Sequence, residues 1–324
     1  MARTRSSGKN GSFEPSYEVR DEPSYFLCTD IDKRALNRYT VSVSDTSTKG
    51  TILMTFSAKD MIRRRKSVRT FTGKPLKNED RVALEEYIQS RTNPFDVPVD
   101  FRLLDAKEYR LSSPVIVGAD LYLAAKVKRC KHYEIGFGYS FEHVCLYAES
   151  LGLGTVMLAA SLSRAAFEKA IGVQEDEVLP VASPVGYPAQ KRSIRESLMR
   201  KGLKADERLP FEQLFFDKQY GNQLAVSSAG AYANALEMAR WAPSAGNKQP
   251  WRAVVIGDTV HFYEEKSIKD SPLGDIQKVD VGIALAHFDL TMQEEGHNGR
   301  FVEGDPGIVL PKSVEYIISY ERGK

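Results

Sequence analysis

The chain has 324 residues, of which 42% are hydrophobic, and its formal net charge is +2. This length allows one large hydrophobic core or two modest ones, and the near-neutral charge gives no overall attraction to nucleic acid. Three cysteines, Cys28, Cys130 and Cys145, are too few for a disulfide framework, so we expect a reducing, cytoplasmic setting. No apolar run reaches the roughly 18 residues that a membrane helix needs, and no secretory signal is expected.

Residues 1–56 are rich in Ser, Thr, Lys, Arg and Asp and show little hydrophobic period. The first dozen residues have the composition of a disordered segment. Two short stretches, 38–44 and 51–56, have weak strand patterns. We therefore expect an N-terminal extension over 1–56, partly disordered, with the folded part beginning at Ser57.

From Ser57 onward, apolar patterns typical of helices and strands alternate along the chain. The sequence predicts helices at 57–71, 78–90, 139–154 and 163–172, and strands at 100–106, 113–120, 155–160 and 177–188. Ser57 is expected to cap the first helix, and Gly152 and Gly154 to end the third. Helices interleaved with strands indicate an α+β layer fold.

A second series of elements begins after Pro188. The sequence predicts a helix, a loop and a strand across 231–257, a hairpin turning at Gly257, a helix at 279–296 and a strand at 314–321. The two series share features, since Leu146 lies six residues before Gly152 and Leu290 lies six residues before Gly296. We expect a diverged internal repeat, with one half at 57–190 and the other at 191–324.

The basic stretch RRRKSVR, residues 63–69, places five cations within seven positions. On the predicted helix, Arg65 and Arg69 lie at i and i+4 and share a face, with Ser67 between them. Two guanidiniums and a hydroxyl match a phosphate monoester in geometry and charge. The alternative is a solvated basic face, or a patch for RNA or acidic lipid, and composition alone favours this alternative.

The loop WAPSAGNKQPW, residues 241–251, combines rigid, polar and aromatic residues. Pro243 and Pro250 stiffen it, which lowers the entropy lost on binding. Ser244 and Asn247 offer hydrogen-bond donors and acceptors, and the flanking indoles add flat apolar area. Such a set suits a flat heterocycle, although an ordinary helix end followed by an edge strand stays open as an alternative.

A metal site is not expected from this sequence. The pairs Cys130 with His132 and His143 with Cys145 lie at i and i+2, where side chains on a helix point apart. No second pair follows at the spacing of a zinc site.

Together, the stretches RRKSVRTF, APSAGNKQPW, GLGT and PVGYPA resemble the nitroreductase superfamily of FMN-dependent oxidoreductases, from about Ser57 to the C-terminus. The resemblance implies an α+β fold with a mixed, mainly antiparallel sheet flanked by helices. It also implies that FMN takes a hydride at N5 from NADH or NADPH and passes it, in ping-pong order, to a nitroaromatic, a quinone or a similar small acceptor. In that family, two identical chains bury FMN at their shared interface.

The resemblance assigns three groups of residues to the cofactor. The phosphate would be held by Arg65, Ser67 and Arg69, with Arg208 as the best match for a further basic residue. The flavin would be lined on one side by Leu158, Ala159 and Ala160, and met from the other side by Pro243, Ser244 and Asn247. No protein acid–base pair is required.

One departure from the family pattern concerns the order of these motifs. In the family, the Pro-Ser loop closely follows the basic helix, whereas here the corresponding loop, 92–101, lacks the motif. We therefore expect two fused units in a monomer that acts as an internal pseudo-dimer, with one complete site and one empty site. Two other functions stay open: a flavin- or nucleotide-binding module without turnover, and an RNA-binding protein with a basic helix.

Overall fold

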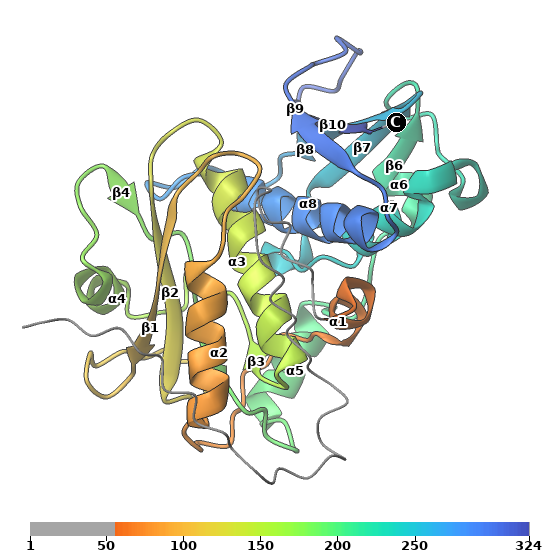
Figure 1. Cartoon of the computed structure of the whole chain (residues 1–324). Coiled ribbons are helices and arrows are strands. Elements are labelled where there is room, and N and C mark those ends of the chain that lie inside the picture. Colours follow the sequence, from red (N-terminus) through yellow and green to blue (C-terminus); the bar gives the residue numbers. More distant parts are fainter. Residues whose placement is uncertain (1–55, 324) are drawn as a thin grey trace, which may run out of the picture. The chain divides into compact units, whose positions relative to one another are not determined.

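The computed structural model describes residues 56–323, so the predictions made for 1–55 lie outside the described residues. In the described part, helices and strands are mixed along the chain (Figure 1). The α-helices are α1 (Ala58–Arg64), α2 (Asn78–Gln89), α3 (Tyr133–Ser150), α4 (Arg164–Ile171), α5 (Ile194–Gly202), α6 (Phe211–Leu214), α7 (Ala233–Arg240) and α8 (Ile276–Glu294). The strands are β1 (Val99–Asp105), β2 (Leu121–Lys128), β3 (Gly154–Thr155), β4 (Glu177–Val178), β5 (Ala182–Gly186), β6 (Phe215–Asp217), β7 (Trp251–Ile256), β8 (Thr259–Glu265), β9 (Gly299–Val302) and β10 (Val314–Arg322).

The strands of residues 56–323 form two five-stranded sheets. The first sheet has the order β1-β2-β5-β3, with β4 also paired to β2, and every pair in it is antiparallel. The second sheet has the order β6-β7-β8-β10-β9, in which β6 and β7 are parallel and the other pairs antiparallel. The predicted α+β class with mainly antiparallel pairing is therefore confirmed, although the strands divide into two sheets.

The first sheet is covered on both faces, because alternate residues of β2 are buried in two different hydrophobic clusters. Leu123 and Ala125 face the core that contains α3, whereas Tyr122 and Ala124 face a separate cluster with Phe167 of α4. In Figure 1, α4 lies on one side of this sheet and α2 and α3 on the other. Because side chains on both faces are buried, the strand is a nearly continuous apolar run without the alternation of a half-exposed strand.

Helices α3 and α8 cross at the centre of the described unit (Figure 1). A Cβ atom on Gly138 of α3 would overlap the backbone carbonyl of Val279, and a Cβ atom on Gly282 of α8 would overlap the carbonyl of Ile135. The two glycines therefore allow the helix backbones to touch, and both helices are buried along most of their length.

Several elements agree with the sequence predictions. The structure confirms the helices predicted at 78–90, 163–172 and 279–296, and the hairpin between β7 and β8 that turns at Gly257. Helix α3 ends as predicted, with Gly152 in the left-handed region, but it begins six residues earlier than expected. Helices α5 and α6 and strands β2, β6 and β9 were not predicted.

Three predicted strands are wrong in extent. Of the strand predicted at 155–160, only Thr155 belongs to β3, and Leu158 forms an isolated bridge to Ala182. The stretch 113–120 is a loop, in which Val117 bonds to the basic segment, and the neighbouring strand is β2. The predicted strand at 177–188 is divided into β4 and β5. Pro180 lies between them and has no N–H to donate to a sheet ladder.

The helix predicted for 57–71 is also wrong in extent, because α1 ends at Arg64. Ser57 caps its N-terminus by accepting a hydrogen bond from the Asp60 amide, as predicted. The following residues are extended and bond to β3 and to the loop 113–120, with Val68 N to Thr155 O at 2.9 Å and Phe71 N to Val117 O at 2.8 Å. These bonds replace the helical ones that the sequence pattern favoured.

The crossing of α3 and α8 makes Gly138 a sensitive position. We expect Gly138→Ala to lower the free energy of unfolding by about 1–3 kcal/mol or more, because the added methyl has no space beside Val279. Gly202 at the end of α5 is a matched control, since a Cβ atom there meets nothing, and Gly202→Ala should leave stability unchanged or slightly higher. Chemical denaturation measures both changes, and equal stabilities of the two variants would contradict the account.

Candidate functional site

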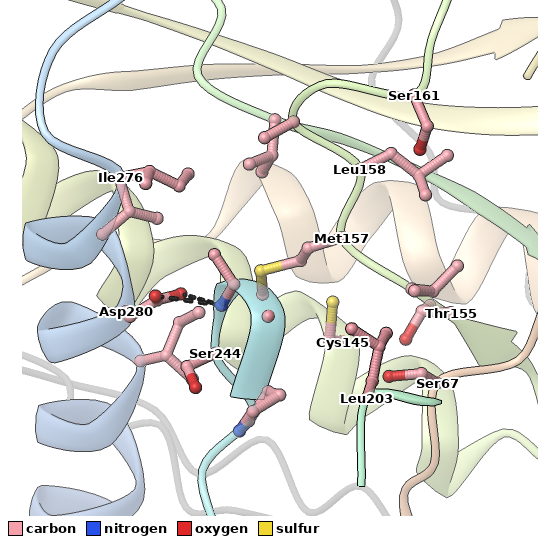
Figure 2. Close-up of a pocket in the computed structure, with 18 of the residues that line it drawn as sticks. Ser67, Cys145, Thr155, Met157, Leu158, Ser161, Leu203, Ser244, Ile276 and Asp280 are labelled. Carbon is pink, nitrogen blue, oxygen red and sulfur yellow. Dashed lines mark hydrogen bonds between the residues drawn. The ribbon is translucent and has the colours of Figure 1, made fainter. Parts of the chain in front are cut away.

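A cavity of about 350 Å³ lies among the basic segment after α1, the segment 155–161 at and after the end of β3, the loop that follows α7, and the first turns of α8. This size is within the range of small-molecule sites. Figure 2 shows Ser67, Met157, Leu158 and Ser244 lining the cavity from these different segments. Its walls thus include residues from both of the predicted halves.

The basic segment reaches the cavity through alternate residues. Arg65, Ser67 and Arg69 all line it, although the helix that was predicted to place Arg65 and Arg69 on one face ends before them. In an extended chain, residues two apart point to the same side, so the three side chains still share a face. The predicted grouping is therefore observed, but the predicted i, i+4 reason for it is wrong.

The wall opposite the loop comes from the segment after β3. Leu158, Ala159 and Ala160, which the resemblance assigns to the flavin, line the cavity. Leu158 exchanges two backbone hydrogen bonds with Ala182 of β5, and the Arg164 guanidinium donates to the Ala159 carbonyl at 2.5 Å. These bonds fix the wall to the first sheet and to α4.

The loop after α7 is held in an unusual backbone conformation. Gly246, Asn247 and Gln249 all have positive φ values, between 52° and 59°. Asn tolerates this left-handed region better than most residues. The Asn247 amide donates to the carbonyls of Lys204 and Glu207 at 2.9 and 3.1 Å, and the Gln249 amide oxygen accepts from the Leu209 amide at 2.9 Å. These two side chains therefore tie the loop to the segment that carries Arg208.

A smaller cavity of about 110 Å³ shares residues with the larger one and is strongly basic. Asn247 and Arg208 line this smaller cavity, together with Pro243 and Ser244, so the predicted site residues divide between two spaces with shared walls. Its charged lining consists of Arg63, Arg65, Lys66, Arg69, Arg200, Arg208 and Asp206. Six cations and one carboxylate, which is paired with Arg200, give this smaller cavity an excess of positive charge.

Two of these arginines have hydrogen-bonding capacity that the protein does not use. The Nε atoms of Arg69 and Arg208 are buried without a partner among the described residues. Burial lowers the pKa of Arg69, and only 9% of its surface is exposed. Burial, with the neighbouring charges of Arg65 and Arg240, lowers the pKa of Arg208 to about 10. A bound anion would satisfy these donors and offset the mutual repulsion.

Arg65 is linked to the interior through Glu142 of α3, which also lines the large cavity. Arg65 Nε lies 3.8 Å from Glu142 Oε1, and the same oxygen lies 2.8 Å from His287 Nε2. His287 is fully buried on α8, and its Nδ1 lies 3.0 Å from the carbonyl of Met238. This chain of contacts orients the guanidinium from α3, α8 and α7 together.

Several lining residues were not predicted from the sequence. They are Glu142 and Cys145 on α3, Met199 and Leu203 at the end of α5, and Ile276, Val279, Asp280 and Ile283 on α8. Of these residues, only Asp280 could have been found from the sequence, because a carboxylate within the apolar stretch VDVGIAL is unusual in a buried helix. Conversely, Trp251 of the loop motif lies in the hydrophobic core rather than in the cavity.

The described residues show neither of two other kinds of site. Within 56–323, no group of three or more His, Cys, Asp or Glu side chains is arranged to hold a metal ion. In the same range, no helix is both long and apolar enough to cross a membrane.

An apolar cavity with a basic annex, set in an α+β fold, is typical of proteins that bind a phosphorylated heterocycle. The sequence profile of the family described as "Putative TM nitroreductase" matches residues 57–292, and the chain belongs to this nitroreductase family. The family resemblance stated from the sequence is thereby confirmed. Comparison with curated proteins gives no match.

Solved structures give further similarities. A crystal structure from Thermotoga maritima, described as a putative nitroreductase, is 19% identical, with a TM-score of 0.55 over 86% of this chain and 98% of that chain. A second, from Bacteroides thetaiotaomicron, described as a putative NADH dehydrogenase/NAD(P)H nitroreductase, is 24% identical over 43% of this chain and 90% of that chain, with a TM-score of 0.36. A variant of the FMN and NADPH-dependent nitroreductase NfnB from Sphigopyxis sp. strain HMH is 14% identical over 43% of this chain and 92% of that chain, with a TM-score of 0.37.

The basic cavity leads to a prediction about anions. We expect inorganic phosphate to raise the thermal midpoint of the protein beyond the effect of sodium chloride at equal ionic strength, because a ligand stabilises the state that binds it. The double variant Arg65→Ala/Arg69→Ala should lose most of this response, since each charge-assisted hydrogen bond contributes about 1.5–3 kcal/mol. The control is Arg81→Ala/Arg102→Ala, which removes two exposed arginines outside the cavities. An unchanged response of the first variant would rule out the phosphate site.

Proposed function

We propose that the protein is an FMN-dependent oxidoreductase that uses NADH or NADPH to reduce a nitroaromatic, a quinone or a similar small acceptor. Bound FMN would supply the redox chemistry, by accepting a hydride at N5 and passing it on. The observation that carries this proposal is the convergence of the Arg65–Arg69 segment and the Pro243–Asn247 loop on one apolar cavity with a basic annex. The protein's own task is then to bind, orient and shield the cofactor.

The residues present fit FMN in their chemistry. The small cavity offers buried guanidinium donors for a phosphate, through Arg65, Arg69 and Arg208, with the Ser67 hydroxyl beside them. The large cavity offers mainly apolar walls for a ring system, together with hydroxyl groups and backbone amides for its polar edge. In this proposal, Leu158, Ala159 and Ala160 line the ring from the first half. Pro243, Ser244 and Asn247 meet it from the second half.

We also propose that the halves 57–190 and 191–324 form an internal pseudo-dimer. A constant offset of 144 residues relates Gly138 to Gly282, Ile135 to Val279 and Gly152 to Gly296. The first two of these pairs support the proposal, because Gly138 packs on Val279 as Gly282 packs on Ile135. A reciprocal contact of this kind is what a two-fold relation between two helices produces.

The same offset identifies where a second site would lie, and aromatic side chains fill that place. It relates the cavity residues Met157 and Ile283 to Phe301 and Tyr139. The ring of Phe95, from the loop 92–101, lies 5.2 Å from the Phe301 ring and 5.7 Å from the Tyr139 ring. This packing supports one complete cofactor site in each chain, with the related site closed, and a monomer as the working form.

We also propose a cytoplasmic setting, with NADH or NADPH as the electron donor. Cys130 and Cys145 are unpaired in the described part of the chain, which fits a reducing cytoplasm. NADPH is the donor named for the Sphigopyxis relative. We propose NADH or NADPH here without choosing between them.

Steady-state kinetics tests the proposed activity. Protein loaded with FMN should oxidise NADH or NADPH in the presence of a nitroaromatic or a quinone. Initial rates at varied donor and acceptor should give parallel double-reciprocal lines, because both substrates must approach the same open cavity in turn. Intersecting lines would contradict a shared site. A protein that binds FMN but oxidises neither nucleotide would instead be a binding module without turnover.

A further inference from the structure

Asp280 occupies an unusual position in the wall of the large cavity. It lies on the second turn of α8, and only 4% of its surface is exposed. Both carboxyl oxygens lie near one donor, the Ala245 amide, at 3.0 and 3.1 Å (Figure 2). Ala245 follows Ser244 in the loop that would meet the cofactor, so Asp280 connects α8 to this loop.

The surroundings of Asp280 do not compensate a negative charge. Among residues 56–323, no cationic side chain lies within ion-pair distance of it, and the Ala245 amide is the one donor within hydrogen-bond distance. A carboxylate has room for about four hydrogen bonds, and burying one with so few donors is costly.

Other charged groups face Asp280 or its cavity from the neighbouring elements. Asp275, which caps α8, and Glu264 of β8 are buried carboxyls that act on Asp280 electrostatically. Glu142 of α3 lines the same cavity, as do Arg65 and Arg69 of the basic segment, and these arginines also line the smaller, basic cavity. The loop residues 243–246 that line the cavity bring no charged side chain.

Electrostatics supports a neutral form of this group. Burial raises the pKa of Asp280 well above its usual range, the Ala245 hydrogen bond acts in the opposite direction, and the charges of Asp275 and Glu264 raise the pKa further. Burial likewise raises the pKa of Glu264 to about 8. Asp280 and Glu264 are thus two buried carboxyls whose surroundings favour the neutral form.

We propose that Asp280 is a neutral carboxylic acid. One of its oxygens accepts a hydrogen bond from the Ala245 amide, and its hydroxyl donates a hydrogen bond to an acceptor atom of the bound heterocycle. The donor role rests on the proposed FMN function, whereas the neutral state does not. The residue related to Asp280 by the offset of 144 is Gly136, against which Val97 packs in the closed region. The carboxyl is therefore present only where the cavity is open.

The first test uses the protein without cofactor and compares its unfolding free energy with that of Asp280→Asn as pH rises from 4 to 8. A folded-state pKa above the unfolded value of about 3.9 contributes stability that is present at low pH and lost as pH rises. The wild-type value minus the variant value should therefore fall with increasing pH. Both proteins contain Asp275 and Glu264, so the direct contributions of these two carboxyls cancel in the difference, which reports Asp280 together with its coupling to them. A difference that rises with pH, or stays constant, would show an ionised Asp280 and overturn the proposal.

The second test measures FMN affinity by fluorescence titration at neutral pH. Asp280→Asn keeps one acceptor and one donor in a neutral group, so its dissociation constant should stay within about threefold of the wild-type value. Asp280→Ala lacks both bonds, and its affinity should fall about tenfold or more. Asp289→Asn is the matched control, because Asp289 is a buried carboxyl on the same helix that bonds to Tyr139 and Gln293 outside the cavity. It should bind FMN like the wild type.

The FMN titrations distinguish a failure of the donor role of Asp280 from a failure of the proposed FMN function. A strong loss of affinity in Asp280→Asn, or none in Asp280→Ala, would overturn the hydrogen-bond donor role. If no variant and no wild-type protein binds FMN, the proposed function fails, and the donor role fails with it. The pH test on the cofactor-free protein would still decide the protonation state of Asp280.

Discussion

The contact between the backbones of α3 and α8 is the constraint on which the rest of the structure depends. At Gly138 and Gly282, no side chain separates the two helices, so their carbonyls lie against bare Cα positions. Each helix also packs on other elements, α3 on α2 and the first sheet, and α8 on α7 and the second sheet. The close crossing therefore fixes the two sheets relative to each other. It also brings the basic segment, bonded to the first sheet, beside the loop that leads into the second.

The candidate site combines two environments that a single element could not provide. The large cavity is mainly apolar and takes its walls from α3, α8 and the segment after β3, whereas its annex collects six cations around one small space. Such a concentration of positive charge, in which Arg69 and Arg200 are buried, is unfavourable by itself, and Glu142 and Asp206 balance only part of it. The remaining imbalance favours an anionic ligand, and a phosphorylated ring compound fits both environments at once.

Much of the fold could be predicted because local pattern and tertiary packing agree. Helices such as α2 and α4 have strong period and recognisable ends, and the β7–β8 hairpin has a Gly–Asp turn. The predicted elements were wrong where hydrogen bonds to distant parts of the chain determined the local backbone conformation. The extended run after Arg64 pairs with Thr155 and Val117, which are distant in sequence, and no local signal reveals such partners.

The grouping of the candidate site residues was recoverable from the sequence, although partly for the wrong reason. The predicted helix would have placed only Arg65 and Arg69 on one face, whereas in the extended chain Arg65, Ser67 and Arg69 all point to the same side and line the cavity. Asp280 and Glu142 were missed, because each lies in a helix buried on all sides, where periodicity gives no direction. The role of Asn247 in holding the loop likewise depends on carbonyls of 204 and 207, which only the fold brings near.

The central claim is that one chain builds one complete FMN site from its two halves. Its most direct test is the amount of FMN released per chain by denaturation, measured together with the mass of the loaded protein in solution. The account predicts one FMN per chain on a particle with the mass of a single chain. Two FMN per chain, or binding that appears only when two chains associate, would contradict it.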